Sequence, residues 1–83
     1  MVDSMINPPQ SRAGRALLNW TQTQLAEASR TSVSTIRDFE SGKRAPMPNN
    51  LEAIRRALES AGVEFIPENG GGAGVRLKKS GGG

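Results

Sequence analysis

The chain has 83 residues, a length that suits one small domain. It contains no cysteine and no histidine. The missing residue types exclude a disulfide framework and a thiolate metal site, along with the commonest general base and zinc ligand. The formal net charge is +3 and the sequence pI is about 10.2, which suits a polyanionic partner without identifying one. No apolar run approaches the roughly 18 residues needed to cross a bilayer, and the N-terminus does not resemble a signal peptide. We therefore expect a cytoplasmic protein with no membrane partner, no metal and no cofactor.

The first predicted helix begins at Asn7-Pro8-Pro9-Gln10. The asparagine caps the helix, the prolines occupy positions where no N–H is needed, and the glutamine can bond back to the cap. The helix should run to about Leu18, where Asn19 tolerates a left-handed stop. Residues 1–6 are expected to form a flexible lead-in. The residues predicted to face the core are Ala13, Ala16 and Leu17, followed by Trp20.

The segment from Thr21 to Arg44 predicts two short helices joined by a tight turn. Thr21 and Gln24 have capping-box spacing, which marks the start of the first of these helices. The helical period breaks at Arg30-Thr31-Ser32, and the serine at the end of this break can cap the next helix. Gly42 is the usual type of residue for a left-handed helix end. This spacing is typical of a helix-turn-helix, a unit that sets its second helix into the major groove of DNA.

The second of these helices has two different faces. Ile36 and Phe39 are three residues apart and point to the core, as Leu25 does from the preceding helix. The opposite face combines short side chains with side chains that can form hydrogen bonds, which is what a helix in the major groove requires. The plainer alternative is an ordinary solvated helix face. The residues on this opposite face are Val33, Ser34, Arg37 and Asp38.

A fourth helix is predicted over residues 51–60, after a loop whose last residues, Asn49 and Asn50, have capping chemistry. Gly62 stops this helix. The segments 63–66 and 75–78 have strand composition and flank a glycine-rich turn. Two alternatives follow for this hairpin. Because an isolated hairpin is marginal in water, it either packs on the fourth helix or pairs with its twin in a second subunit. We favour the second arrangement because it gives each edge strand a partner and adds to a small core. The expected dimerisation residues are Val63, Phe65, Ile66, Val75 and Leu77.

Four short motifs in this order resemble the phage-repressor (Xre/Cro-type) helix-turn-helix family of bacterial and phage regulators. The resemblance covers residues 7–62 and implies a mainly α fold, a small four-helix (lambda-repressor-like) DNA-binding domain. A β extension at 63–79 and a disordered tail at 80–83 would follow it. The motifs are Trp20-Thr21-Gln22, Leu25-Ala26-Glu27, Ser32-x-x-Thr35-Ile36 and Phe39-Glu40-x-Gly42-Lys43.

The resemblance also implies site residues. The base-reading positions of the family fall on Val33, Ser34 and Asp38, with Arg37 beside them. Val33 suits a thymine methyl group, Asp38 a cytosine amino group or a neighbouring arginine, and Arg37 a guanine or a phosphate. A structural ion pair between Arg15 and Glu40 is implied between the first and third helices. The expected phosphate contacts are Thr21, Gln22, Ser32, Thr35, Lys43 and Arg44.

Two positions depart from the family pattern. Arg30 stands in the turn where glycine is usual, and a left-handed conformation there costs about 1 kcal/mol. The turn is therefore distorted, or the arginine gains a phosphate contact in return. Gly14 lies inside the first helix and weakens it by about 1 kcal/mol, unless another helix crosses closely at this point.

Together these observations predict a sequence-specific regulator that binds double-stranded DNA as a homodimer on a roughly palindromic operator. Its location would be the cytoplasm of a bacterium, at the nucleoid. The alternative is a protein-interaction module, of the antitoxin or anti-activator type, with a regulatory protein partner and secondary DNA binding. An enzyme is not expected, because the sequence lacks a nucleophile–base pair, paired carboxylates and a phosphate loop; the glycine run 70–72 opens no helix.

Overall fold

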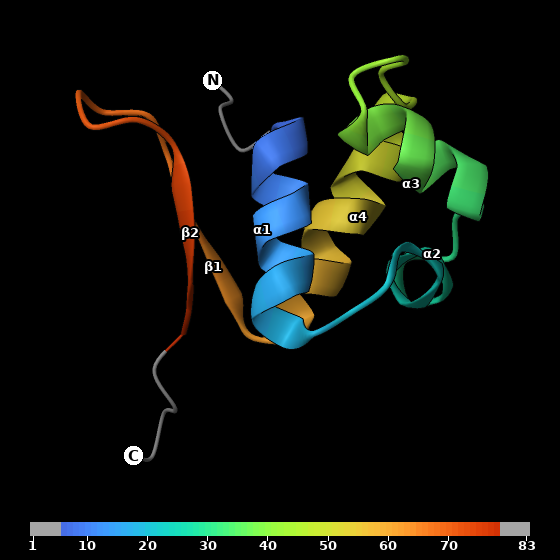
Figure 1. Ribbon diagram of the computed structural model, residues 1–83, viewed down its shortest axis with the longest axis horizontal. Helices are drawn as coiled ribbons and strands as arrows, with labels where there is room; N and C mark the ends of the chain where they lie inside the picture. The colour runs from blue at the N-terminus through green and yellow to red at the C-terminus, as the bar shows by residue number, and fades with distance from the viewer. Residues whose placement is uncertain (1–5, 79–83) are drawn as a thin grey trace.

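The structure, a computed structural model, describes residues 6–78 and confirms the predicted fold class. Four helices are followed by a two-stranded antiparallel hairpin (Figure 1). The expectations for residues 1–5 and 79–83 lie outside the described part of the chain. In chain order the elements are α1 (Pro8–Leu18), α2 (Gln22–Ser29), α3 (Val33–Glu40), α4 (Pro48–Ser60), β1 (Val63–Ile66) and β2 (Gly74–Leu77).

The ends of α1 are set by local hydrogen bonds, as predicted. The Asn7 side chain accepts from the backbone N–H of Gln10 at 2.8 Å, and the Gln10 side chain accepts from the backbone N–H of Asn7 at 3.0 Å. This reciprocal pair satisfies two of the donors that a helix start leaves free. At the other end Asn19 adopts the left-handed conformation, with φ of 58°, and the helix stops there.

The apolar face predicted for α1 is wrong. Ala13 and Ala16 are exposed, and the Leu17 side chain is 38% exposed. The helix instead turns its small and polar side to the core, because α4 and the hairpin pack closely on that side. The buried residues of α1 are Gln10, Ser11 and Gly14.

Gly14 allows this close packing. A Cβ atom added at Gly14 would lie 3.5 Å from Leu58 Cδ2 of α4 and 3.5 Å from Val63 Cγ1 of β1. A second helix does therefore cross α1 at the glycine, which is the condition under which the sequence tolerates a glycine in the middle of a helix. The separation is ordinary van der Waals contact, so the site has room for one methyl group.

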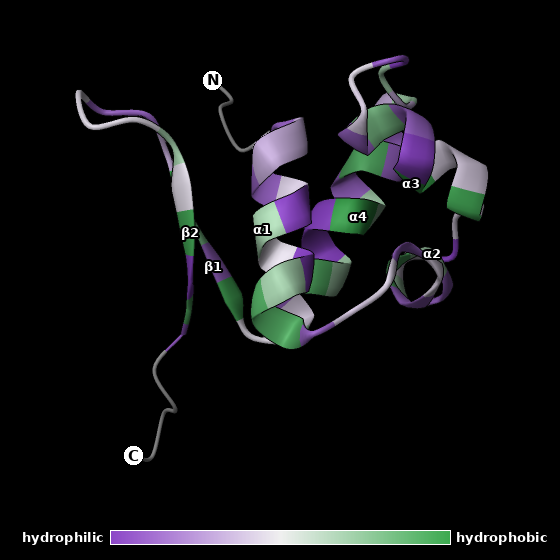
Figure 2. Cartoon of the chain, in the orientation of Figure 1, coloured by the Kyte–Doolittle hydropathy of each residue, from purple (hydrophilic) through white to green (hydrophobic). Residues whose placement is uncertain are grey.

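Helix α4 begins earlier than predicted. Pro48 occupies its first turn, Met47 is the N-cap residue, and no side chain caps the helix. Asn49 and Asn50 lie inside the first turn, so the capping role predicted for them is wrong. Proline is well suited to the first helical position, because its fixed φ is helical and it has no N–H to leave unpaired. The ribbon of α4 alternates between hydrophobic and hydrophilic residues, as expected of an amphipathic helix (Figure 2).

One core joins the helices and the first strand. Ile6 belongs to this core, so the expected flexible lead-in does not extend to residue 6. Trp20 packs against the core but is only partly buried. The buried apolar residues are Ile6, Leu25, Ala26, Ile36, Phe39, Leu51, Ile54, Leu58 and Val63.

The two strands pair with each other inside one chain. Val63 lies opposite Leu77, and Phe65 lies opposite Val75. The hairpin packs on α1 and α4, which is the first of the two arrangements considered from the sequence. Gln10 links α1 to the last strand pair before the hairpin turn. Its side-chain amide donates to the carbonyl of Gly74 at 3.1 Å and lies 3.4 Å from the carbonyl of Ile66.

Within residues 6–78, no helix is both long and apolar enough to pass through a membrane. The same part of the chain contains no group of three or more histidine, cysteine, aspartate or glutamate side chains that could hold a metal ion.

Candidate nucleic-acid interface

Two N-cap residues and one residue in the left-handed conformation set the ends of α2 and the start of α3. The Thr21 hydroxyl accepts from the backbone N–H of Gln24 at 3.0 Å, and the Gln24 side chain accepts from the Thr21 backbone at 2.8 Å. Arg30 ends α2 with φ of 58° and ψ of 40°. The turn therefore keeps regular left-handed geometry with an arginine in place of glycine, and the predicted distortion is absent. Ser32 then caps α3, accepting from the backbone N–H of Thr35 at 3.1 Å.

The residues predicted to read bases lie together on the outer face of α3. Ser34 and Arg37 are exposed, the Val33 side chain is 38% exposed, and Asp38 is half-buried. The opposite side of the helix is occupied by the buried residues Ile36, Phe39 and Glu40. Helix α3 thus fixes its orientation through its buried side and leaves a mixed polar surface facing away from the core.

A cluster of hydroxyl groups surrounds the start of α3. The Ser32 hydroxyl lies 3.2 Å from that of Ser34 and 2.9 Å from that of Thr35. The predicted phosphate ligands Ser32 and Thr35 are therefore in mutual contact, next to the free N–H groups of the helix start. Such a site favours an anion.

Two cations follow directly after α3. Gly42 adopts φ of +80°, and the backbone N–H groups of Lys43 and Arg44 donate to the carbonyl of Asp38 at 2.9 and 3.2 Å. These bonds fold the chain back at the helix end, and both side chains are exposed. Within residues 6–78, none of the ion pairs involves Arg37, Lys43 or Arg44, so their charges are available to an external anion.

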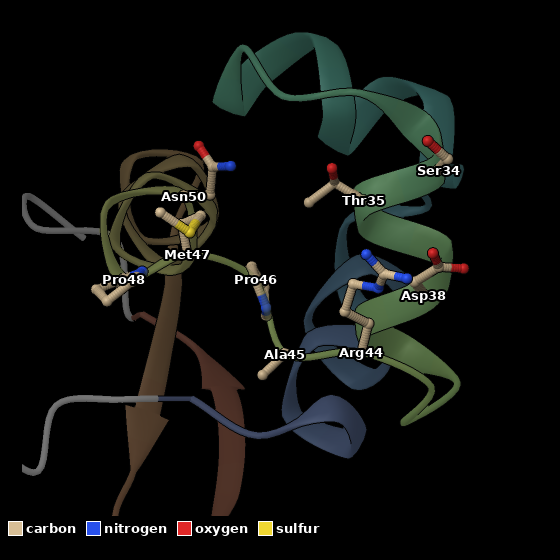
Figure 3. Close-up of a pocket in the computed structure, with 9 residues that line it drawn as sticks. All are labelled: Ser34, Thr35, Asp38, Arg44, Ala45, Pro46, Met47, Pro48 and Asn50. Carbon is tan, nitrogen blue, oxygen red and sulfur yellow. The ribbon is translucent and has the colours of Figure 1, made fainter.

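A groove separates α3 from the loop that leads to α4 (Figure 3). Its volume is about 420 Å³. Thr35, Asp38 and Arg44 line one side, and Pro46 and Met47 line the other. The Met47 side chain is 66% exposed, so an apolar side chain lies across the groove from the polar residues of α3. No pattern in the sequence predicts an exposed methionine at this position.

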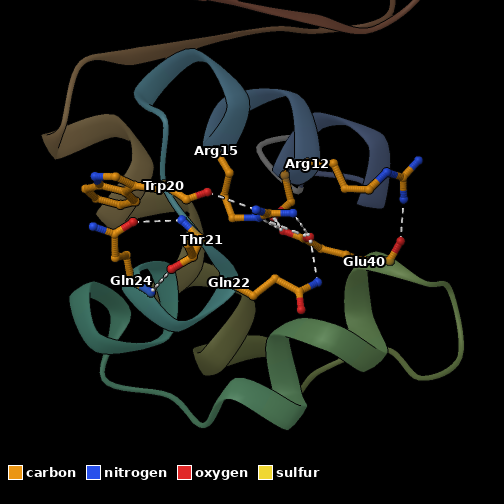
Figure 4. A network of polar contacts seen from close by, with 8 residues as sticks. Arg12, Arg15, Trp20, Thr21, Gln22, Gln24 and Glu40 are labelled. Carbon is orange, nitrogen blue, oxygen red and sulfur yellow. Dashed lines mark hydrogen bonds and ion pairs between the residues drawn. The ribbon is translucent and has the colours of Figure 1, made fainter.

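Behind α3 a buried carboxylate joins three helices (Figure 4). Glu40 is 2% exposed, and the predicted ion pair with Arg15 of α1 is present, with an Nη2–Oε1 distance of 2.7 Å. The Ser11 hydroxyl donates to Glu40 Oε2 at 2.7 Å, and the Gln22 amide donates to Oε1 at 3.2 Å. Arg15 also donates to the carbonyl of Trp20 at 2.9 Å. The positions of α1, α2 and α3 therefore depend on one another.

Hydrogen bonding decides the ionisation of this carboxylate. Burial on its own would raise the pKa of Glu40, but bonds from Arg15, Ser11 and Gln22, together with the arginine charge, outweigh burial and lower the pKa below its ordinary value. Glu40 is therefore ionised at neutral pH. It holds the side chain of Gln22, a predicted phosphate ligand, at the start of α2.

Sequence analysis missed two members of this network. Ser11 is fully buried and binds Glu40, and the Arg12 guanidinium donates to the backbone carbonyl of Glu40 near the end of α3. The face predicted for α1 consisted of Ala13, Ala16 and Leu17, so neither Ser11 nor Arg12 was expected to make a contact with the third helix. Once Gly14 is recognised as the buried side of the helix, Ser11 and Arg15 share a face with it or flank it.

The residues predicted for dimerisation differ in position. Val63 is fully buried in the core of its own chain and is not available to a partner. Phe65, Ile66 and Val75 are half-buried, whereas the Leu77 side chain is 49% exposed. Only the last residue therefore presents a large apolar side chain on the hairpin surface.

Comparison with known proteins agrees with this geometry. A family model described as helix-turn-helix matches residues 12–65, which is more than half of the 83 residues and includes all of α2 and α3. A comparison with curated protein sequences finds no match. The matched family, of the Xre/Cro type, consists of DNA-binding regulators. The chain belongs to this helix-turn-helix family.

Proposed function

We propose that the protein is a sequence-specific transcriptional regulator that binds double-stranded DNA as a homodimer. The observation that supports this function best is the outer face of α3. Its exposed arginine, Arg37, has no carboxylate partner within the described residues, and two further free cations follow at the helix end. In the cell such a regulator would be found in the bacterial cytoplasm, at the nucleoid.

The outer face of α3 supplies sequence discrimination in this proposal. Arg37 donates to the major-groove edge of a guanine, and Asp38 accepts from the amino group of a cytosine. Val33 and Ser34, at the start of the helix, are short enough to let the backbone approach the bases; the valine contacts a thymine methyl group.

Phosphate contacts set the position of α3 in the groove. Lys43 and Arg44 bind phosphates on one side of the groove. Thr21 and Gln22, at the start of α2, bind phosphates on the other side of the groove. Ser32 and Thr35, at the start of α3, add further phosphate contacts. Because Gln22 is already held by Glu40, little side-chain entropy remains to be lost when it meets DNA.

A homodimer would place two copies of α3 in successive major grooves, about 34 Å apart, on a roughly palindromic operator. We assign the contact between subunits to the hairpin side of the molecule, including Phe65, Ile66, Val75 and Leu77. The hairpin packs on the side of α1 away from α3, so such a contact leaves α3 free (Figure 1).

Selection of bound duplexes from a random pool tests the proposal. The expected result is an enriched motif with two inverted half-sites at constant spacing. A single unpaired half-site would overturn the homodimer but not the DNA-binding function. If no duplex is retained over competitor DNA even at low ionic strength, DNA binding is wrong. The antitoxin or anti-activator alternative, with a protein as its main partner, would then take its place.

A further inference from the structure

The outer edge of β2 has unpaired backbone groups. The N–H of Lys78 donates to the carbonyl of Gly62 at 2.6 Å, and the strands continue from there in antiparallel register. Hydrogen-bonded and non-bonded residue pairs alternate along two antiparallel strands. The backbone N–H and C=O groups of Arg76 and Gly74 therefore face β1. The backbone groups of Val75 and Leu77 therefore point away from β1, to the open edge. Within residues 6–78 the sheet has only two strands, so no third strand covers this edge.

Exposed apolar side chains are present on β2 and on the helix that packs against it. Leu77 of β2 is 49% exposed and Leu17 of α1 is 38% exposed. Two of the four large exposed apolar residues within the described chain thus belong to α1 and β2, which pack against each other. Ala13 lies one turn before Leu17 and is also exposed. This is the stripe that the sequence assigned to the core and that the fold leaves uncovered.

A groove continues the stripe towards the tip of the hairpin. It has a volume of about 330 Å³ and lies between α1 and the chain leading into β2. Pro9 and Ala13 line it on one side, and Ala73 and Val75 on the other. The groove lies at one end of β2 and the exposed Leu77 lies at the other. An exposed leucine and a mainly apolar groove, which Gln10 and Glu68 also line, are therefore present on one surface at opposite ends of β2.

We propose that this surface binds a second copy of the same chain, which deepens the proposed homodimer. The two β2 strands pair antiparallel about a two-fold axis at Val75 and form a four-stranded sheet. In this register Leu77 lies opposite Ala73 of the partner subunit, so its side chain enters the partner's groove. The partner's Leu77 does the same in return. Backbone groups of Val75 and Leu77 gain hydrogen bonds, and the stripe on α1 is covered.

Charge disfavours two of the registers open to a self-paired strand. With the axis at Arg76, the two Arg76 side chains would stand directly opposite each other on the outer face, which is unfavourable. With the axis at Leu77, Arg76 would stand opposite Lys78 of the partner subunit, which is no better. With the axis at Val75, Arg76 stands opposite Gly74 of the partner subunit, and each arginine keeps its ion pair with Glu64 at 3.1 Å.

The self-complementary arrangement favours a second copy over a different protein. The exposed Leu77, the groove beside Ala73 and the open backbone groups of Val75 all belong to β2 or to the chain leading into it, at positions that a two-fold axis at Val75 exchanges. A two-fold interface requires this relation, because the same patch must serve both sides. Pairing also removes an open sheet edge, which would otherwise promote uncontrolled association.

Single-cysteine variants test the register. The chain has no cysteine of its own. In the proposed register residue 74 of one copy and residue 76 of the other form a non-bonded pair, with Cα atoms about 4.5 Å apart, within disulfide reach. A Cβ atom at Gly74 would meet only Ile66, at 3.8 Å or more, so the site accepts cysteine. Under mild oxidation, a mixture of Gly74→Cys and Arg76→Cys should crosslink, whereas each variant alone should not. Crosslinking of Arg76→Cys alone, or none in the mixture, overturns the proposal.

Sedimentation of Leu77→Glu at several concentrations tests the surface itself. We expect monomers with a native circular-dichroism spectrum, because the replaced side chain is half exposed. Met47→Glu is the matched control, since Met47 is also exposed but lies beside α3; it should remain dimeric. A dimeric Leu77→Glu variant contradicts the proposal. DNA binding is measured separately: a protein that crosslinks as expected but binds no duplex refutes the regulator and leaves the interface standing.

Discussion

At the scale of single residues, Glu40 connects the stability of the fold with its surface. A buried carboxylate is costly unless it is ionised and fully bonded. Glu40 meets this condition through Arg15, Ser11 and Gln22. The same bonds orient Gln22 at the start of α2. A change at Glu40 therefore affects both the free energy of unfolding and the surface proposed to meet DNA.

The pH dependence of the free energy of unfolding tests the contribution of Glu40. Its pKa in the folded protein is lower than the ordinary 4.5. The resulting stabilisation is therefore complete above pH 4.5 and is lost as the pH falls through the folded-state pKa. Glu40→Gln should lower the free energy of unfolding at pH 7 by about 3 kcal/mol and make it less dependent on pH below about 5. Urea denaturation between pH 7 and pH 3 checks this. Parallel curves for the two proteins would contradict it, since the other carboxylates are unchanged.

Two glycines with different backbones give a second prediction. Gly14 is helical and has room for one methyl group, whereas Gly42 has φ of +80° and nothing within 4 Å of an added Cβ. Gly14→Ala should stabilise the protein by about 1 kcal/mol, the helix-propensity difference. Gly42→Ala should destabilise it by about 1 kcal/mol, because the left-handed conformation is strained for alanine. Thermal melting measures both, and a lower melting temperature for Gly14→Ala would mean that α4 and β1 do not tolerate the methyl group.

At the scale of elements, local chemistry made most of the fold predictable. Thr21 with Gln24, and Asn7 with Gln10, define helix starts through contacts within four residues, which a sequence displays directly. The orientation of α1 could not be read in this way. Its glycine looked like a weakness until α4 was seen to pack on it, and that contact joins distant parts of the chain. The start of α4 was misplaced because asparagine and proline both favour helix starts.

The candidate site was predictable to a similar extent. Val33, Ser34 and Arg37 share the outer face of α3 because helical periodicity fixes their direction once Ile36 is buried. Ser11 and the exposed Met47 were not predictable, since one depends on how α1 is rotated and the other on the path of a loop. Pairing of β1 with β2 inside the chain likewise depended on how the hairpin packs on the helices.

Base and phosphate contacts of α3 predict different responses to mutation. Arg37→Ala should weaken binding to the selected operator and relax the preference at one base pair by about 1–3 kcal/mol. Lys43→Ala should weaken binding to all sequences alike and reduce the slope of log affinity against log salt by about one unit. Arg56→Ala is the control, because Arg56 of α4 is exposed but paired with Glu52. Titrations of operator and scrambled duplexes at several salt concentrations distinguish these results. A uniform loss for Arg37→Ala would reassign it to phosphate.

At the scale of the whole molecule, α1 separates two surfaces. Ser11 of α1 bonds to Glu40 of α3, whereas Gln10 and Gly14 contact the hairpin, which lies on the other side of α1 from α3 (Figure 1). The proposed DNA contact and the proposed subunit contact therefore do not compete for the same residues. A core this small gains from association, because a short chain buries only a modest fraction of its apolar surface. Dimer formation and folding should then be thermodynamically linked.

This linkage makes the melting temperature depend on protein concentration. Association stabilises only the folded chain, so raising the concentration should raise the melting temperature by a few degrees for each tenfold step. Leu77→Glu removes the proposed contact while leaving Val63 and the rest of the core in place, so its melting temperature should not change with concentration. Calorimetry over a hundredfold range measures both proteins. If the native chain melts at one temperature throughout and sediments as a monomer, association contributes nothing to its stability, and operator binding must rest on single subunits.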